Sequence, residues 1–236
     1  MHRLLATSAE LDHDAPSLSR EALQHLRVVR PKPGEKVELF DGAGRKREFV
    51  FDGSALVAAG PVETLPRRPG ELVLFACVTK GQRWDWTLEK ATELGVTRIV
   101  PVISERTIVR LKGDERAAKR DRWRKICEEA ARQSDAVWLP EMCEPVDFSA
   151  AAEMARRTKA FVGALVDPPP KPLMQALAGV GERDALSIFI GPEGDFTPAE
   201  LAALLSFAVP VSLGPTILRA ETAAIFALSV MAAARH

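Results

Sequence analysis

Two glycine- and proline-rich loops in the C-terminal third of the chain carry the residues best suited to chemistry. The first loop is Ile190-Gly-Pro-Glu-Gly-Asp195, and the second is Leu213-Gly-Pro-Thr-Ile-Leu-Arg219. Each loop follows an apolar, strand-like stretch and precedes a helix-like one, and α/β proteins bind ligands at such strand ends. Because the two loops are close in sequence, they predict one shared pocket.

Arg219 stands where the sequence predicts the start of a helix, near Ala220. A cation at a helix N-terminus opposes the helix dipole, so local stability does not account for this arginine. We predict that Arg219 holds an anion or a polar substrate. The alternative interpretation is a surface ion pair with Glu221.

A second helix start follows the first loop. Thr197 and Glu200 form a capping box, with Pro198 at the first helical position. The free N–H groups and the positive dipole end of this helix then face whatever binds at the strand end. An ordinary strand-to-helix turn is the alternative interpretation of this loop by itself.

Apolar runs that alternate with helical patterns predict an α/β fold with a parallel sheet covered on both faces. The runs are residues 71–78, 98–103, 160–166, 186–190 and 209–213. Before them, residues 1–68 carry short strand signals separated by turns, which predict a small antiparallel β domain. The segment 62–70 is the best linker, so we expect domains at 1–68 and 69–236.

The chain has 32 basic and 32 acidic residues, which argues against a uniformly basic nucleic-acid binder. Locally, however, the segment 106–125 holds nine basic residues against three acids. The N-terminal part adds Arg20, His25, Arg27, Arg30 and Lys32. Two basic surfaces favour a large folded RNA over a small metabolite, although a charge run is often only a solvated helix face.

Cysteines and apolar segments exclude several classes. Cys77, Cys127 and Cys143 lie far apart with no CxxC pair, so we expect neither a disulfide framework nor a metal site. No apolar run approaches the roughly 20 residues that span a bilayer. We therefore expect a soluble, cytoplasmic protein with no membrane partner.

Several motifs agree in order and spacing with one known family over nearly the whole chain. They are His25-Leu-Arg-Val-Val-Arg30, Phe40-Asp-Gly-Ala-Gly44, Lys90-Ala-Thr-Glu-Leu-Gly-Val96, Ala131-Arg-Gln-Ser134, Ile190-Gly-Pro-Glu-Gly194, and Ile217-Leu-Arg219 with Glu221-Thr-Ala223. With these motifs the chain resembles the RsmE family of 16S rRNA uridine-N3 methyltransferases, of the SPOUT class. The resemblance implies S-adenosylmethionine-dependent methylation of uridine N3 in 16S rRNA of the small ribosomal subunit.

The resemblance also implies a fold, an assembly and a site. It implies a PUA-like β-barrel that binds RNA, followed by a SPOUT domain with a parallel sheet and a C-terminal trefoil knot, in a homodimer. Arg219 is the expected catalytic cation, and Glu193 or Asp195 is a candidate for proton removal or base orientation. The implied cofactor-binding residues are Leu165, Ile190, Gly191, Pro192, Gly194, Leu213, Gly214, Ile217 and Leu218. The implied RNA-binding residues are Arg3, Arg20, His25, Arg27, Arg30, Lys80 and Arg106.

The sequence departs from the family pattern at four positions. Asp195 stands where the family usually has glycine, Thr216 where it has arginine, Ala220 where it has threonine, and Arg132 where it has glutamate. Two alternatives therefore stay open: a SPOUT methyltransferase that acts on another RNA, and a non-catalytic RNA-binding or assembly factor. A nucleotide-phosphate binder is disfavoured because the chain has no GxxxxGK[ST] run.

Overall fold

The chain divides into two compact units in a computed structural model that describes residues 1–235. The first unit is Met1–Arg68 with Glu128–Leu139, and the second is Pro69–Cys127 with the chain from Pro140 onward. The division at residue 68 expected from the sequence differs in one respect, because residues 128–139 pack with the N-terminal unit. Arg3 Nη1 donates to the carbonyl oxygen of Ala131 at 2.7 Å, and Trp138 Nε1 donates to that of Leu65 at 3.2 Å. These contacts join residues more than 70 positions apart, for which the sequence has no local signal.

The first unit contains a five-stranded sheet and two short helices. The elements are β1 (His2–Leu5), α1 (Ser8–Asp12), α2 (Arg20–Val29), β2 (Lys36–Phe40), β3 (Arg45–Phe51), β4 (Leu56–Ala58) and β5 (Glu63–Thr64). The order is β1-β2-β3-β4, and β5 also pairs with β3. The expectation of a wholly antiparallel domain is wrong at one pair, since β1 and β2 are parallel. The two helices between β1 and β2 supply the crossover that a parallel pair requires.

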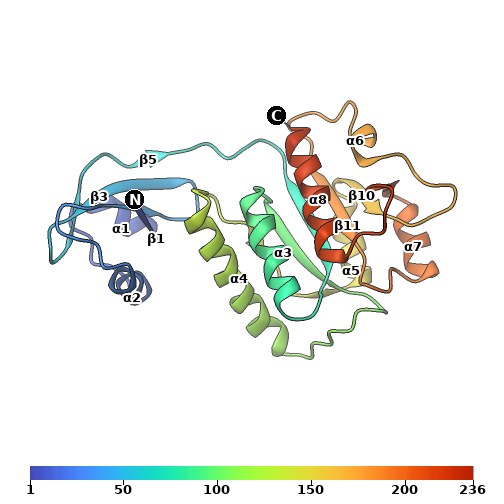
Figure 1. The fold of residues 1–236 in the computed structure, drawn as a ribbon, viewed down its shortest axis with the longest axis horizontal. Helices are drawn as coiled ribbons and strands as arrows, with labels where there is room; N and C mark the ends of the chain where they lie inside the picture. The colour runs from blue at the N-terminus through green and yellow to red at the C-terminus, as the bar shows by residue number, and fades with distance from the viewer. Residues whose placement is uncertain (236) are drawn as a thin grey trace. The chain divides into compact units, whose positions relative to one another are not determined.

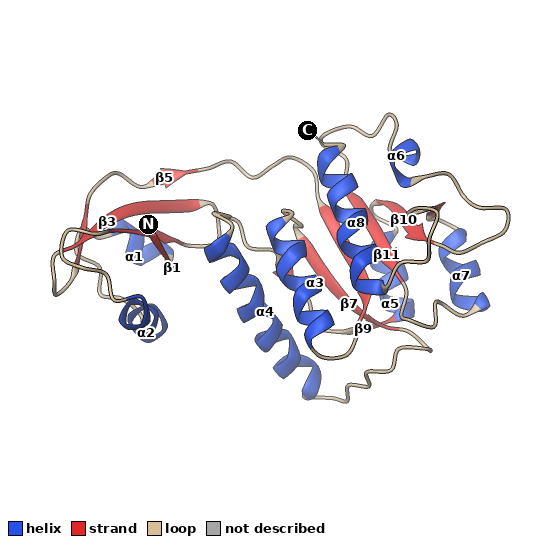
Figure 2. Cartoon of the chain, in the orientation of Figure 1, coloured by secondary structure: helices blue, strands red, loops and turns tan. Residues whose placement is uncertain are grey.

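The second unit confirms the predicted α/β fold with a parallel sheet (Figure 2). Its strands are β6 (Leu72–Cys77), β7 (Arg98–Ile103), β8 (Glu141–Met142), β9 (Val146–Asp147), β10 (Lys159–Gly163), β11 (Leu186–Ile190) and β12 (Val209–Val211). Its helices are α3 (Gln82–Glu93), α4 (Glu115–Gln133), α5 (Phe148–Ala155), α6 (Leu173–Ala176), α7 (Pro198–Leu205) and α8 (Ala220–Ala233), although α4 ends in the first unit. The strand order is β12-β10-β11-β6-β7-β8, with β9 beside β7, and every pair is parallel.

Strand β6 shows why the apolar runs form a central sheet. Leu72 and Leu74 contribute to one buried cluster, whereas Val73 and Phe75 contribute to another. The first cluster includes residues of α3 and α8, and the second includes residues of α5 and α7. Alternate side chains of a strand point to opposite faces, so helices cover the sheet on both sides (Figure 1). The small-residue-rich helix α8 lies against α3, β6 and β11.

Parallel pairing brings the carboxyl ends of β10, β11, β12, β6 and β7 to one edge of this sheet. The two glycine- and proline-rich loops follow β11 and β12 at that edge. The strand order also reverses direction around β6, since β7 lies on one side and β11 on the other. Ligands bind at such an edge in open α/β sheets. None of the helices in residues 1–235 has the length and apolarity to cross a membrane.

Candidate functional site

The two loops and the end of β10 enclose a pocket of about 280 Å³. That volume is at the small end of the roughly 300–1,000 Å³ typical of ligand pockets. Three chain segments line it, and they meet only because β10, β11 and β12 are neighbours in the sheet. The lining residues are Gly163, Ala164, Leu165, Ile190, Gly191, Pro192, Glu193, Asp195, Val211, Ser212, Leu213, Gly214, Thr216, Ile217, Leu218, Arg219, Ala220 and Ala223. The predicted shared pocket is therefore present.

The first loop, residues 191–197, is held by its own contacts. Asp195 has a positive φ of 58°, and its Oδ1 accepts a hydrogen bond from the amide of Phe196 at 2.7 Å. A side chain at Gly191 would come within 3.0 Å of that same oxygen. Thr197 and Glu200 form the predicted capping box of α7. Asp195 therefore occupies a left-handed conformation that glycine adopts freely and that aspartate can also adopt when its side chain makes a local hydrogen bond, so an aspartate fits where the resemblance leads us to expect glycine.

The second loop, residues 212–219, is held at its start by backbone hydrogen bonds of Ser212 to Lys171 and Leu173, and beyond that point it has fewer contacts than the first loop. Ser212 Oγ accepts from the amide of Gly214 at 3.3 Å, and Gly214 has a φ of 137°. Within residues 1–235, the amides of Thr216, Ile217 and Leu218 donate no hydrogen bond. Ile217 is 80% exposed. This loop offers free backbone donors and an uncovered apolar side chain to the pocket.

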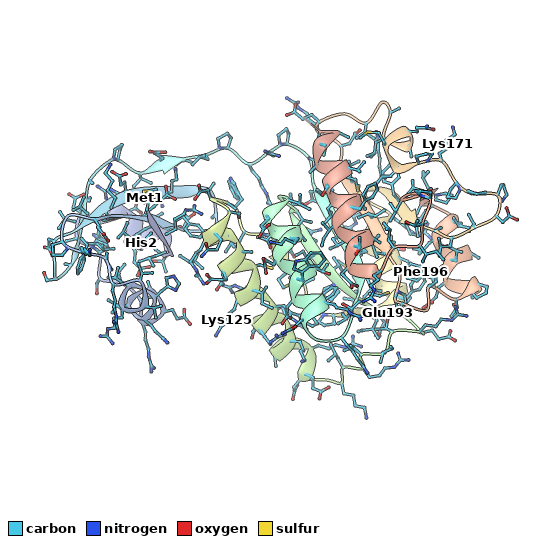
Figure 3. The ribbon with its side chains drawn as sticks, in the orientation of Figure 1. Met1, His2, Lys125, Lys171, Glu193 and Phe196 are labelled. Carbon is cyan, nitrogen blue, oxygen red and sulfur yellow. The ribbon has the colours of Figure 1, made fainter. Side chains whose placement is uncertain are left out.

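Charged side chains gather at the rim of the pocket. Arg83, in the first turn of α3, lies between two carboxylates, with Nη1 3.6 Å from Glu193 Oε1 and Nε 3.8 Å from Glu221 Oε1. Glu193 lies on the loop near the N-terminal end of α8 (Figure 3). Arg219 is the N-cap residue of α8, but its side chain makes no capping hydrogen bond. The alternative of a surface ion pair between Arg219 and Glu221 is wrong, because Glu221 is buried and, within residues 1–235, its ion-pair partner is Arg83.

The predicted cofactor-binding residues fall into two groups. Gly194 does not line the pocket, because its carbonyl oxygen faces Arg106, whose Nη1 donates to it at 2.8 Å. All the other predicted cofactor residues line the pocket, as do both predicted catalytic residues. Sequence reasoning missed Gly163, Ala164, Val211, Ser212 and Ala223. The strand ends among them could have been found from the rule that ligands bind at carboxyl ends of strands.

The predicted RNA-binding residues of the first unit need one correction. Arg3 is 7% exposed, and its Nε donates to Glu38 Oε1 at 2.6 Å. Because its guanidinium is also bonded to the carbonyl oxygen of Ala131, Arg3 is a structural residue that cannot reach a phosphate. In contrast, Arg20, Arg27 and Arg30 are exposed, on α2 or at its end.

His25 is only half-buried on α2. Burial, together with the nearby Arg132, lowers the pKa of His25 below its ordinary value. A lowered pKa disfavours the charged imidazole that an ion pair with a phosphate needs.

The basic segment 106–125 carries less free charge than its composition indicates. Arg116 pairs with Asp147 at 2.6 Å, Arg120 with Asp121 and Glu144 at 2.8 Å each, and Arg122 with Asp85. Lys80 and Arg106 are exposed, and Arg106 uses one nitrogen on Gly194. Three of the six arginines in this segment are therefore neutralised by acids of the second unit, which favours the interpretation of a solvated helix face for them.

Within residues 1–235 no group of three or more His, Cys, Asp or Glu residues is arranged to hold a metal ion. Burial raises the pKa of the Cys77 thiol to about 11. A thiol with so high a pKa is protonated at neutral pH and is a poor nucleophile.

Comparison with known proteins extends over both units. A family model for an RNA methyltransferase domain matches residues 66–232. The ribosomal RNA small subunit methyltransferase E of Bacillus subtilis is 31% identical over 226 residues, covering 91% of this chain and 88% of that protein. A methyltransferase from Legionella pneumophila, solved with the bound cofactor S-adenosylmethionine, is 30% identical with a TM-score of 0.83, covering 99% of this chain and 98% of that one. A ribosomal RNA small subunit methyltransferase E from Neisseria gonorrhoeae, bound to S-adenosylmethionine, is 28% identical with a TM-score of 0.82, covering 98% of this chain and 96% of that one.

Proposed function

Because the chain belongs to the ribosomal RNA small subunit methyltransferase E family, we propose that it methylates N3 of a uridine in 16S rRNA with S-adenosylmethionine as methyl donor. The observation that carries the proposal is the pocket between the ends of β10, β11 and β12, lined also by Arg219, whose side chain has no partner within residues 1–235. Two structures of similar fold contain S-adenosylmethionine. An rRNA substrate also implies a cytoplasmic enzyme.

The pocket residues fit this cofactor. Leu165, Leu213 and Ile217 provide apolar walls of the kind a purine ring needs, and the loop amides at 216–218 are free to donate hydrogen bonds. Glu193 and Asp195 add carboxylates to the lining, and these would attract the positively charged sulfonium of the cofactor. The proposed cofactor-binding residues are Leu165, Ile190, Gly191, Pro192, Leu213, Gly214, Ile217 and Leu218. Bound S-adenosylmethionine supplies an electrophilic methyl group.

Methyl transfer to uracil N3 makes two demands on the protein. The reacting atoms must be held in line at near-attack distance, and the negative charge that develops on the uracil carbonyl oxygens needs a fixed cation. We assign the cation to Arg219, whose side chain has no ion-pair or hydrogen-bond partner within residues 1–235. We assign to Glu193 the role of orienting the base, because its carboxylate lies 3.6 Å from Arg83 Nη1 at the same rim.

Three features of the fold belong to the same proposal. The first unit is proposed to be a PUA-like RNA-binding domain, supported by its five-stranded sheet. The second is proposed to be a SPOUT domain with a C-terminal trefoil knot, supported by the likeness to methyltransferase structures over nearly the whole chain. A homodimer is proposed through α8, on which Phe226 remains 42% exposed.

The test is the nucleoside content of rRNA from a strain that lacks the protein. Mass spectrometry should show the loss of N3-methyluridine from 16S rRNA, and the purified protein should restore it on small subunits from that strain. Arg219→Ala should lower methylation by about 10²-fold or more with unchanged folding. An unchanged N3-methyluridine content in the deletion strain contradicts the proposal. Loss of a different methylated nucleoside would instead show another RNA target.

The RNA-binding assignment is tested separately on α2. Charge reversal of Arg27 and Arg30 to glutamate should weaken binding to small subunits and reduce its salt dependence, because phosphate contacts release counterions. Cofactor affinity should not change, since both residues lie outside the pocket. Unchanged binding to small subunits would remove α2 from RNA recognition.

A further inference from the structure

Glu221, in the first turn of α8, is a buried carboxylate whose bonding is incomplete. The residue is 7% exposed, and its Oε2 has no hydrogen-bond partner within residues 1–235. The other oxygen, Oε1, lies 3.8 Å from Arg83 Nε, which is near the outer limit of an ion pair. Burying a carboxylate oxygen without a donor costs free energy, and native structures leave few such atoms. The helix dipole favours an acid at this position, but it does not supply the missing donor.

Glu221 is connected to the pocket on two sides. Along the chain, Arg219, Ala220 and Ala223 all line the pocket. Through space, Arg83 contacts Glu221 and also lies 3.6 Å from Glu193, which lines the pocket as well. Neither Glu221 nor Arg83 lines the pocket itself, but each adjoins a residue that does, so a ligand that extends from the pocket over this rim can supply the donor that Oε2 lacks.

The groups at this rim can offer two donors and one acceptor. Arg83 and Arg219 carry guanidinium N–H groups, and the Glu221 carboxylate accepts. The Watson–Crick edge of uracil carries the complementary set: a carbonyl oxygen, the N3–H and a second carbonyl oxygen. Cytosine presents an unprotonated N3 and an amino group on the same edge, so it would leave Glu221 without a donor and place an amino group against an arginine.

We propose that Glu221 accepts the N3 proton of the target uracil, with Arg83 and Arg219 donating to the flanking carbonyl oxygens. This inference rests on the function proposed above and names the proton acceptor and the base-selecting group that the function requires. The N3–H bond breaks and its proton passes to Oε2 of Glu221, while the N3 electron pair forms the new N–CH₃ bond. The electron pair of the S–CH₃ bond stays on the sulfur of the departing S-adenosylhomocysteine, and Glu221 afterwards releases the proton to water.

The variant Glu221→Gln keeps the size of the side chain and an acceptor oxygen but cannot take up a proton. We expect kcat to fall by about 10²- to 10⁴-fold, the usual contribution of a general base, with little change in affinity for small subunits. The rate of the variant should then climb with pH, because the uracil loses its N3 proton to solvent at high pH without help. A purely structural role would lower the rate without changing its pH dependence.

Two other glutamates provide the comparison. Glu182→Gln makes the same chemical change at an exposed residue before β11 and should leave rate and pH profile unchanged. Glu193→Gln should lower the rate, because it loosens Arg83, but should keep the wild-type pH profile. The proposal is overturned if Glu221→Gln stays within about threefold of wild type, or if Glu193→Gln alone shows the altered pH profile.

Binding provides a readout that does not depend on turnover. Once the methylated position is mapped, small subunits are reconstituted with uridine or cytidine there, and their affinities for the protein without cofactor are compared. The wild type should prefer uridine by about fivefold or more, the low end for one good base pairing, and Glu221→Ala should lose the preference. Equal affinities for wild type contradict the proposal.

The outcomes separate this inference from the proposed function. If wild type does not methylate subunits from the deletion strain, the function itself fails. If wild type is active, the Glu221 variants decide the inference alone. Sedimentation of Glu221→Gln tests whether a second copy of the chain supplies the donor instead: a shifted monomer–dimer equilibrium with an unchanged pH profile would overturn the assignment.

Discussion

The two loops of the pocket have similar sequences but different support. In the first loop, Phe196 is 4% exposed and its ring centroid lies 5.7 Å from that of Phe148, while the capping box of α7 holds Thr197. In the second loop, Ile217 is 80% exposed and the amides of 216–218 are free within residues 1–235. One loop is complete without a ligand, and the other has unused donors and apolar surface.

This difference indicates that the two loops have different roles in ligand binding. A loop fixed by its own contacts provides a rigid wall against which a ligand is positioned. A loop with few contacts gains its order from the ligand, so its order depends on binding free energy. The following predictions test whether the contrast is as sharp as the contacts indicate.

The largest expected effect on stability comes from replacing one apolar side chain in each loop with alanine. Phe196→Ala should lower the free energy of unfolding by about 3–5 kcal/mol, because it empties a packed site. Ile217→Ala should change it by about 0.5 kcal/mol or less, since the side chain is exposed, and should weaken S-adenosylmethionine binding. Urea denaturation and calorimetry measure the two effects. Similar stability losses in both variants would break the contrast.

Hydrogen exchange with and without S-adenosylmethionine compares the loops directly. At about 100 times Kd, binding contributes about 2.7 kcal/mol, so the amides of 216–218 should exchange up to about 100-fold more slowly. The amides of Phe196 and Thr197, which donate to Asp195 and Glu200, should change much less. Equal protection of both loops would show that the first loop is also ordered by the ligand.

Asp195 tests the internal support of the first loop. Asp195→Ala should cost about 1–3 kcal/mol of stability, because alanine resists a positive φ and cannot accept from the Phe196 amide. Asp195→Gly should cost less than about 1 kcal/mol, since glycine adopts that backbone freely. Thermal unfolding of the two variants measures the difference. If alanine is tolerated as well as glycine, the conformation of Asp195 does not constrain the loop.

The smallest expected effect lies at the helix cap. Thr197→Ala removes a capping hydrogen bond of α7 and should cost about 1 kcal/mol of stability. Thr216→Ala is the matched control in the second loop, where no hydrogen bond of the side chain is lost, and it should leave the unfolding midpoint unchanged. A larger loss at Thr216 than at Thr197 would reverse the comparison.

Sequence reasoning succeeded where the signal is local. The apolar runs predicted the parallel strands, because a strand buried on both faces must be apolar at successive positions. Thr197, Pro198 and Glu200 predicted the start of α7, because capping depends on residues three apart. The position of Arg219 at a helix start followed from the same local logic, and that made it a candidate for chemistry.

Sequence reasoning failed where a role depends on residues distant in the chain. Arg3 was expected to bind RNA, but burial with Glu38 and a bond to Ala131 makes it structural. Arg83 and Glu221 were not selected as site residues, since nothing in either local segment indicates that they face each other. The arginines of α4 were counted as free charge, although acids on other elements neutralise several of them.

The sequence by itself determined the α/β class, the two loops, the residue types of the pocket and the resemblance to a family. The tertiary structure alone decided which side chains remain available for chemistry. The reason is that propensity, capping and apolar periodicity act over a few residues, whereas burial and ion pairing depend on which strands become neighbours. The order β12-β10-β11-β6 brings the two loops together and places α3 beside α8, and only that arrangement puts Arg83 between Glu193 and Glu221.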